Sequence, residues 1–460
     1  MLHLRPASAV GRRILCGGSR HSVPSLRRGL LTLAIESSCD DTSVAIVDKD
    51  PFGSAKIHFL ENVTADLTAY QGIHPIPALE SHQENLAKLV NKALTHLPSA
   101  ADSENDNRKV VTLHDGNNRQ KPDFISVTRG PGMRANLFVG LDTAKGLSVA
   151  WQIPFVGVHH MQAHLLTPRL VSALSLSSPN QTMTPEFPFL SILASGGHTL
   201  LVNSSSLTDH SILATTTDVA IGEALDKAAR DILPPTLLES SKTTMYGKLL
   251  EQYAFPNGPA DYADYTAPRT RGDEIAVSKK ESPYGWSITT PYAQTRQLAL
   301  SFAVVAPAIS QILTRKRIAG QPVSDDERVA MAREAMRVSF EHLASRTIIA
   351  LESLCQWKPK PNHRPTPESV PVKTLVVSGG VAANKFLMTV LRSFLDVRGF
   401  GHVAIVAPPA ALCTDNAAMI GWAGIEMFEA GWRSDYSVRA LRKWSLEKEG
   451  GVLGAGGWVR

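Results

Sequence analysis

The order of secondary-structure signals along this chain of 460 residues occurs twice. Each copy begins with two β-rich runs around a polar turn, which is the pattern of a hairpin. Each copy continues, further along, with a strand that enters a glycine-containing turn and then a helix. The hairpins span residues 31–48 and 189–203, and the strand–glycine–helix units span residues 123–147 and 374–391. Two such halves predict an α/β fold with helices on both faces of the sheets.

Glycine-rich turns before helices are typical of nucleotide-binding proteins. Glycine lets backbone N–H groups approach a phosphate closely, and the helix N-terminus behind the turn favours negative charge. An ordinary tight turn explains any single Gly-Gly pair, but four such turns in alternating order favour a cleft lined by hairpin tips and helix starts.

The basic charge of the chain belongs to its N-terminus. Net charge is +5, yet without six arginines in residues 1–35 the chain has 41 basic and 42 acidic residues. An acid-free, arginine-containing start predicts a mitochondrial transit peptide, with a disordered basic tail as the alternative. The near-neutral body means that any nucleic-acid site is a local patch. The six arginines are Arg5, Arg12, Arg13, Arg20, Arg27 and Arg28.

Composition excludes several classes of protein. Hydrophobic residues make up 43% and charged residues 19%, which rules out a wholly disordered or coiled-coil chain. No run of 18 apolar residues is present, so no membrane span is expected. Four scattered cysteines favour a reducing compartment over a disulfide scaffold.

Residues 156–164 carry the strongest local signal for a metal. His160 and His164 are four residues apart, so on a helix both imidazoles share one face and can bind one ion. A metalloprotease would need glutamate directly after the first histidine, and this position is Met161. A third ligand must come from elsewhere, and Asp415 is the best candidate. Alternatively, Asp415 caps the helix that follows it.

Two other groups of acidic residues are candidates for chemistry. Asp40 and Asp41 lie in the first hairpin turn, where they make Asx-type hydrogen bonds or position a metal, a water or a base. Asp226 lies on an amphipathic helix within residues 218–233, where a carboxylate can bind ribose hydroxyls or simply face solvent.

Polar and proline-rich stretches predict surface insertions or linkers at residues 101–121, 171–186, 256–286 and 356–372. Helices are expected at residues 78–97 and 324–354, the second capped by Ser324.

With these motifs together, the chain resembles the tRNA N6-adenosine threonylcarbamoyltransferase family, once described as O-sialoglycoprotein endopeptidases. The motifs occur in the family's order across residues 31–425, and the N-terminus resembles the mitochondrial branch. They are IESSCDDTSVAIV, RGPG, VHHMQAHLL, LASGGHT, GEALDKAAR, VSGGVAANK and CTDNAAMI.

The resemblance implies an actin-like, sugar-kinase-like (ASKHA) duplicated fold with two related subdomains around a nucleotide cleft. We expect a transit peptide at 1–30, a first subdomain at 31–165 and a second, with insertions, at 186–425. Residues 426–460 are expected to return to the first subdomain.

The resemblance also implies transfer of threonylcarbamoyl from threonylcarbamoyl-AMP to N6 of the adenosine 3′ of the anticodon. The tRNAs concerned read codons that begin with A, and AMP leaves. A separate enzyme would supply the adenylate, and the chain would act as a homodimer in the mitochondrial matrix. Each subunit would hold one divalent metal ion, iron or zinc.

Position by position, the resemblance assigns the metal to His160, His164 and Asp415 and a role in transfer to Asp40. The residues matching nucleotide contacts are Leu193, Ala194, Ser195, Gly196, Gly197, Asp226, Gly247 and Asn384.

The sequence departs from the family in two places. The usual Pro-Gly-Gly-Pro segment is replaced by MYGKLL at 245–250, which supplies Gly247, and a segment resembling Phe-Ser-Gly-Leu-Lys is eroded to 285–296. Two other classes stay open: a kinase or ATPase of the same fold, which would not need the two histidines and Asp415, and a non-catalytic scaffold.

Overall fold

The computed structural model describes residues 29–66, 74–100, 110–178, 181–240, 246–277, 280–355, 371–447 and 451–460. The predicted transit peptide, apart from its last two residues, lies outside these ranges, as does most of the proline-rich stretch 356–372. Within the described part of the chain, no helix has the length and apolar character needed to cross a membrane.

Five strands form the first sheet in the order β3-β2-β1-β6-β7. The first three strands are antiparallel neighbours, whereas β6 runs parallel to β1, and β7 parallel to β6. The predicted first hairpin is confirmed, although Asp41 begins the second strand instead of lying in the turn. The strands are β1 (Leu30–Glu36), β2 (Asp41–Lys49), β3 (Ala55–Thr64), β6 (Phe124–Gly130) and β7 (Phe155–His159).

The second sheet repeats this plan strand for strand, in the order β10-β9-β8-β11-β12. Again three antiparallel neighbours are followed by two parallel strands. The predicted duplication is therefore confirmed, and the fold is of the actin-like, sugar-kinase-like class. The strands are β8 (Phe189–Ala194), β9 (Thr199–Ser204), β10 (His210–Thr215), β11 (Thr374–Ser378) and β12 (Ala404–Val406).

Helices cover both faces of the first sheet because its strands are apolar on both sides. Leu33 and Ile35 of β1 pack with α1 (Pro75–Leu94) and α2 (Arg134–Trp151), whereas Ala34 between them faces α12 (Ala417–Glu429). The side-chain period of two along the strand produces this division.

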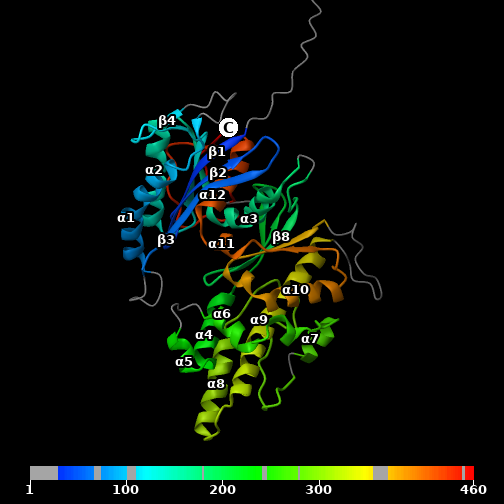
Figure 1. Ribbon diagram of the computed structural model, residues 1–460. Helices are drawn as coiled ribbons and strands as arrows, with labels where there is room; N and C mark the ends of the chain where they lie inside the picture. Colours follow the sequence, from blue (N-terminus) through cyan, green and yellow to red (C-terminus); the bar gives the residue numbers. More distant parts are fainter. Residues whose placement is uncertain are drawn as a thin grey trace, which may run out of the picture.

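A shared core joins the two sheets. It contains α12, α3 (His160–Ser175) and apolar side chains from both sheets, such as Phe124 of β6 and Val376 of β11. In Figure 1 these helices and α11 (Ala410–Cys413) lie between the blue strands β1 to β3 of the first sheet and β8. We refer to the chain around the first and second sheets as the first and second lobes.

Helix α12 approaches the first sheet closely because two of its residues are glycines. A Cβ atom at Gly424 would lie 2.0 Å from Oγ of Ser126, and one at Gly421 would lie 2.8 Å from Cγ2 of Val47. Any larger residue would push the helix, and the loop before it, away from the sheet.

The outer face of the second lobe is covered mainly by helices. The predicted helix with Ser324 as cap is confirmed: Ser324 Oγ accepts from the amide of Glu327 at 3.2 Å. The helical segments are α4 (Ile221–Ile232), α5 (Pro235–Ser240), α6 (Gly247–Ala254), η3 (Gly258–Tyr262), α7 (Arg271–Val277), α8 (Val305–Ile318), α9 (Asp325–Leu354), η5 (Gly380–Ala383) and α10 (Lys385–Val397).

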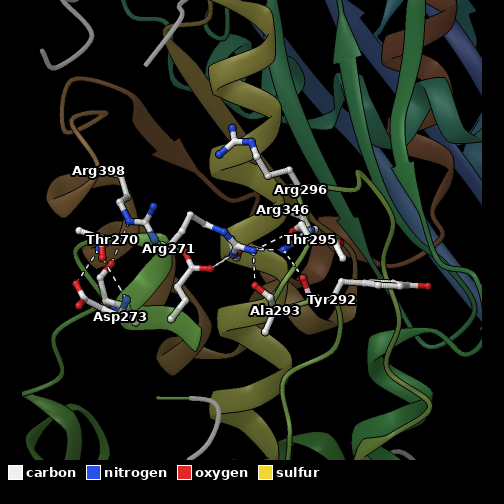
Figure 2. Close-up of polar contacts among 12 residues, drawn as sticks. Thr270, Arg271, Asp273, Tyr292, Ala293, Thr295, Arg296, Arg346 and Arg398 are labelled. Carbon is white, nitrogen blue, oxygen red and sulfur yellow. Dashed lines mark hydrogen bonds and ion pairs between the residues drawn. The ribbon is translucent and has the colours of Figure 1, made fainter. Parts of the chain in front are cut away.

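Residues 285–296 are held by two arginines, the buried Arg346 of α9 and the half-buried Arg271 of α7 (Figure 2). Arg346 donates to the carbonyl oxygens of Thr295 at 3.0 Å and Tyr292 at 3.2 Å, and Arg271 donates to Thr295 O at 2.9 Å. Burial, with other arginines nearby, lowers the pKa of Arg346 to about 10. Arg271 and Arg398 both pair with Glu274.

The chain after α12 packs on the first lobe. Strands β13 (Arg433–Ser434) and β14 (Trp458–Val459) pair with each other, and β13 contacts β7. The guanidinium of Arg129 donates to the carbonyls of Arg439 at 3.1 Å and Gly456 at 2.7 Å.

Three predicted linkers contain regular structure instead, and the stretch 256–286 includes η3 and α7. Strands β4 (Val110–Thr112) and β5 (Asn118–Gln120) form a hairpin within 101–121, because Gly116 supplies the turn with a φ of 82°. Residues 171–175 belong to the end of α3. The helix expected at 78–97 runs from 75 to 94, starting at Pro75 in the first turn.

Candidate metal centre and nucleotide cleft

Two histidines on the first turns of α3 point at one place. Strand β7 ends at His159 and α3 begins at His160, so His160 and His164 lie one turn apart. Their Nε2 atoms are 3.2 Å apart, and each side chain is about nine-tenths buried. The prediction that this segment is helical is confirmed.

Asp415 comes to the same place from the loop before α12. Its Oδ1 lies 3.0 Å from His164 Nε2 and 3.5 Å from His160 Nε2. The alternative role of Asp415 as a helix cap is wrong: Asn416 caps α12, accepting from the amide of Met419 at 3.1 Å. Because Asn416 takes the cap, the Asp415 carboxylate is free to face the imidazoles.

The first lobe fixes the backbone around Asp415. Asn62 of β3 donates to the Asp415 carbonyl at 3.0 Å, and the amide of Ala417 donates to Ser43 Oγ of β2 at 2.9 Å. With the close approach of α12, these bonds set the position of the loop relative to α3.

The side chain of Glu36 supports His160 from behind. This fully buried residue ends β1, and its Oε2 lies 3.2 Å from His160 Nδ1. Thr128 Oγ1 donates to Oε2 and the amide of Ser38 donates to Oε1, both at 2.5 Å. An ionised carboxylate only accepts, so Nδ1 carries a hydrogen, and in the neutral imidazole Nε2 therefore presents its lone pair to Asp415 and His164.

Charge–charge attraction outweighs burial at this site. Burial opposes ionisation of Asp415 and Glu36, but the imidazole of His160 lowers the pKa of both carboxyl groups, and His164 also lowers that of Asp415. Burial likewise disfavours the imidazolium of His160, yet Asp415 and Glu36 raise its pKa to about 9. A cation is therefore the species that this pocket attracts, whether a proton or a metal ion.

The donor set suits a divalent metal. The candidate ligand atoms of His160, His164 and Asp415 lie within 4.8 Å of one another. Two imidazole nitrogens and one carboxylate oxygen are ligands for zinc or iron, and three protein ligands leave coordination positions open.

Asp40 is half-buried in the turn between β1 and β2. Its backbone carbonyl accepts from the amide of Ala65 at 3.0 Å. Two residues earlier, Ser38 Oγ is 3.2 Å from His160 Nδ1. In the residue after Asp40, burial raises the pKa of the Asp41 carboxyl group to about 6, although a hydrogen bond from Thr64 opposes this shift. Burial and the charge of Asp40 raise the pKa of the Cys39 thiol, which keeps it protonated.

The tip of the β8–β9 hairpin forms the glycine edge of the second lobe. Leu193 and Ala194 are buried, so only their backbone can meet a ligand, whereas Gly196 and Gly197 are exposed. Ser195 Oγ accepts from the amide of His198 at 3.0 Å, which shapes the turn.

Neighbouring glycines bring two other elements to this tip. The amide of Gly222, in the first turn of α4, donates to Ser195 O at 3.3 Å. Gly379, at a φ of 95°, lies after β11, where a Cβ would be 2.3 Å from Ala194 O. The tip, the start of α4 and the turn after β11 therefore share one edge of the sheet.

The remaining predicted nucleotide contacts lie nearby in the second lobe. The amide of Gly247, which begins α6, donates to Asp226 Oδ1 at 2.9 Å. Burial raises the pKa of Asp226, while that hydrogen bond lowers it. Asn384 caps α10 by accepting from the amide of Leu387 at 3.0 Å, and only 8% of the residue is exposed.

Helix α11 lies between the glycine edge and the metal centre, since it contacts both η5 and α3. Burial lowers the pKa of His198, at the hairpin tip, and the nearby His160 lowers it further while Asp415 opposes this. Sequence reasoning missed Glu36 and His198 as members of the site, although both lie within the motifs IESSCDD and LASGGHT.

A two-lobed, duplicated α/β fold with a candidate His₂Asp centre beside a glycine-lined edge defines a protein of the actin-like, sugar-kinase-like class. The chain belongs to the tRNA N6-adenosine threonylcarbamoyltransferase family, whose profile matches residues 58–422. This is a family of transferases, as the motifs predicted.

Known relatives cover nearly the whole chain. It is 35% identical over 441 residues to the mitochondrial tRNA N6-adenosine threonylcarbamoyltransferase of Schizosaccharomyces pombe, covering 94% of this chain and 90% of that protein. It is 32% identical over 429 residues to the tRNA N6-adenosine threonylcarbamoyltransferase of Brucella ovis, covering 92% and 98%.

Proposed function

We propose that this chain transfers the threonylcarbamoyl group of threonylcarbamoyl-AMP to N6 of the adenosine 3′ of the anticodon, in tRNAs that read codons beginning with A. Family membership supports this proposal, and one observation carries it. His160, His164 and Asp415 converge between the two lobes, next to the glycine edge that ends β8 and β11. A non-catalytic scaffold would not need this arrangement.

In this reaction a C–N bond forms between N6 and the carbamoyl carbon. The bond from that carbon to the phosphate oxygen of AMP breaks, AMP takes the electron pair, and the amine proton leaves. The amine of adenine is a weak nucleophile, so holding both reactants in line contributes much of the rate.

The exposed turn at Gly196 and Gly197 leaves space for a ligand, and its amides are suited to hold the phosphate of the adenylate, the Gly197 amide by exchanging its hydrogen bond to Ser195 Oγ. Asp226 is suited to accept hydrogen bonds from ribose hydroxyls. Asn384 is buried as a cap, so a ligand would meet the backbone around it first. Gly247 contributes by fixing Asp226.

Asp40 is the candidate to receive the amine proton. It lies on the same hairpin tip as Ser38, which contacts His160. A carboxylate there can accept the proton from N6 or orient a water that does so.

A divalent ion, iron or zinc, fits His160, His164 and Asp415, and when bound it supplies positive charge for phosphate or carbonyl oxygens. Glu36 keeps the imidazole of His160 in the tautomer that such an ion requires.

The proposed setting is the mitochondrial matrix, with the adenylate supplied by a separate enzyme and the chain acting as a homodimer. The mitochondrial S. pombe relative and the acid-free N-terminus support this location.

The test is an in-vitro assay with unmodified tRNA, threonine, bicarbonate, ATP and a separate adenylate-forming enzyme. Nucleoside analysis should detect the modified adenosine only when this chain is added. A His160→Ala variant should lose both metal and product. Product formation by a variant without metal would contradict the proposed site, and no product with the wild-type chain would contradict the function.

A further inference from the structure

Exposed cations that the mechanism does not use lie beside the Asp40 tip. Arg134 is the first residue of α2, and Arg439, Arg442 and Lys443 follow β13. All four are exposed, and none belongs to an ion pair among the residues that the structure describes. Unpaired cations are costly to bring together unless they meet an anion.

Backbone hydrogen bonds place two of these cations, Arg134 and Arg442, next to the turn that carries Asp40. The amide of Met133 donates to Ser38 O at 2.8 Å, and Arg134 follows directly. The amide of Gly132 donates to Arg442 O at 3.4 Å. Arg134 and Arg442 therefore both flank the turn that supports Ser38.

A groove of about 160 Å³ separates α2 from residues 438–440. Phe138 lines it and is 39% exposed, with the guanidinium of Arg134 5.5 Å from its ring centre. Lys145 also lines the groove and donates to Val438 O at 2.6 Å. One carboxylate, Asp142, lies among the lining residues.

We propose that this surface, the α2 patch (Arg134, Phe138, Arg439, Arg442 and Lys443), binds the RNA next to the adenosine that is modified. This inference rests on the proposed function. The four cations contact backbone phosphates, Phe138 stacks on an unpaired base, and Asp142 accepts from an exocyclic amine of that base.

Three features favour RNA over a protein partner. Residues 438–443 hold three cations and no acid, in a chain whose body is otherwise near neutral. An exposed aromatic ring beside an arginine is the usual platform for unstacked bases. The patch also adjoins the turn at Ser38 and Asp40, which must meet the adenosine.

The dependence of RNA affinity on salt concentration distinguishes phosphate contacts from base stacking in the α2 patch. Each phosphate contact contributes about 0.7–0.9 to the slope of log affinity against log salt concentration. Losing two contacts should therefore reduce the slope by about 1.4–1.8, whereas losing a stacked ring should leave it unchanged.

The experiment measures binding of unmodified tRNA to the full-length protein between 50 and 300 mM KCl by fluorescence anisotropy, and the KM for tRNA in the transfer assay. The test variant is R439Q/R442Q. The matched control is R315Q/R317Q, which removes two exposed arginines at the end of α8, far from α2 in the second lobe (Figure 1). F138A tests stacking separately.

For R439Q/R442Q we expect the reduced slope and a KM for tRNA about tenfold higher, with kcat at saturating tRNA unchanged. F138A should weaken binding at least about fivefold at every salt concentration. The control should match the wild type in all three measurements.

An unchanged slope and KM in R439Q/R442Q, with the wild type active, would overturn the α2 patch while leaving the proposed function intact. A change in oligomeric mass without a change in tRNA affinity would assign the surface to contacts between copies and also overturn it. If the wild type made no product but bound tRNA through these arginines, the proposed function would fail and the patch would stand.

Discussion

The Glu36→Gln substitution tests how the metal centre is oriented. The carboxylate of Glu36 is fully buried, and its Oε2 lies 3.2 Å from His160 Nδ1. Glutamine keeps the size of the side chain but removes the charge that holds the Nδ1 hydrogen. Loss of such an outer carboxylate typically lowers metal affinity 10- to 100-fold, which is about 1.4–2.7 kcal/mol.

Proton competition changes the size of this loss with pH. The charge of Glu36 also helps to raise the pKa of His160 to about 9, so a bound proton competes with the ion below that pH. At pH 7, removing the charge of Glu36 weakens the binding of both the proton and the metal ion at His160. Above pH 9 the proton no longer competes, so only the binding of the metal ion is weakened. We therefore expect the larger loss of affinity at pH 9.5.

The assay is competition of the metal-free protein with a chelator for Zn²⁺, at pH 7 and pH 9.5. Glu327→Gln is a matched control, because Glu327 is a buried carboxylate in the second lobe that accepts from Trp286 Nε1 at 2.9 Å. Glu36→Gln protein that melts like the control and binds Zn²⁺ within twofold of wild type at both pH values would refute the orienting role.

Three further outcomes are expected. Asp40→Asn should cut transfer while leaving adenylate binding largely intact, measured by single turnover and by calorimetry; equal loss of binding would exclude a role in proton transfer. Burial lowers the pKa of His210 to about 4, so its neutral form stabilises the fold above pH ~6.5, and this is lost as pH falls. The contribution of His210 to the free energy of unfolding falls by about 1.4 kcal/mol per pH unit below pH ~6.5. His210→Gln should therefore flatten the decline of the urea midpoint between pH 7 and 5. Arg346→Met should lower Tm by several degrees, because Tyr292 O and Gln297 O lose charged donors worth about 1.5–3 kcal/mol each, whereas Thr295 O keeps Arg271; an unchanged Tm in differential scanning fluorimetry would argue against that clamp.

Local sequence patterns predicted much of the fold. Period-two apolar runs around polar turns predicted both hairpins, and glycine turns before amphipathic runs predicted the helices that follow β6 and β11. These signals lie within about twenty residues of each other, so steric and hydrophobic preferences of the local chain express them fully. The hairpin at 110–120 escaped notice because its strands have three residues each.

The candidate site likewise has residues that the local sequence predicts and residues that only distant contacts bring in. His160 and His164 are readable from the sequence alone, since one helical turn separates them and the helix is a local structure. Asp415 lies 251 positions from His164, so the residues alone gave it as the best candidate for a third ligand but left helix capping open as the alternative, and the family resemblance favoured the ligand role.

Only the tertiary structure decided which of two adjacent polar residues caps α12 and which faces the imidazoles, because the glycine face of α12 sets how closely the helix meets the first sheet. It also decided that Glu36, 124 positions from His160, stands behind that ring. Packing between the lobes brings such residues together, and the local sequence around each residue does not specify its distant partner.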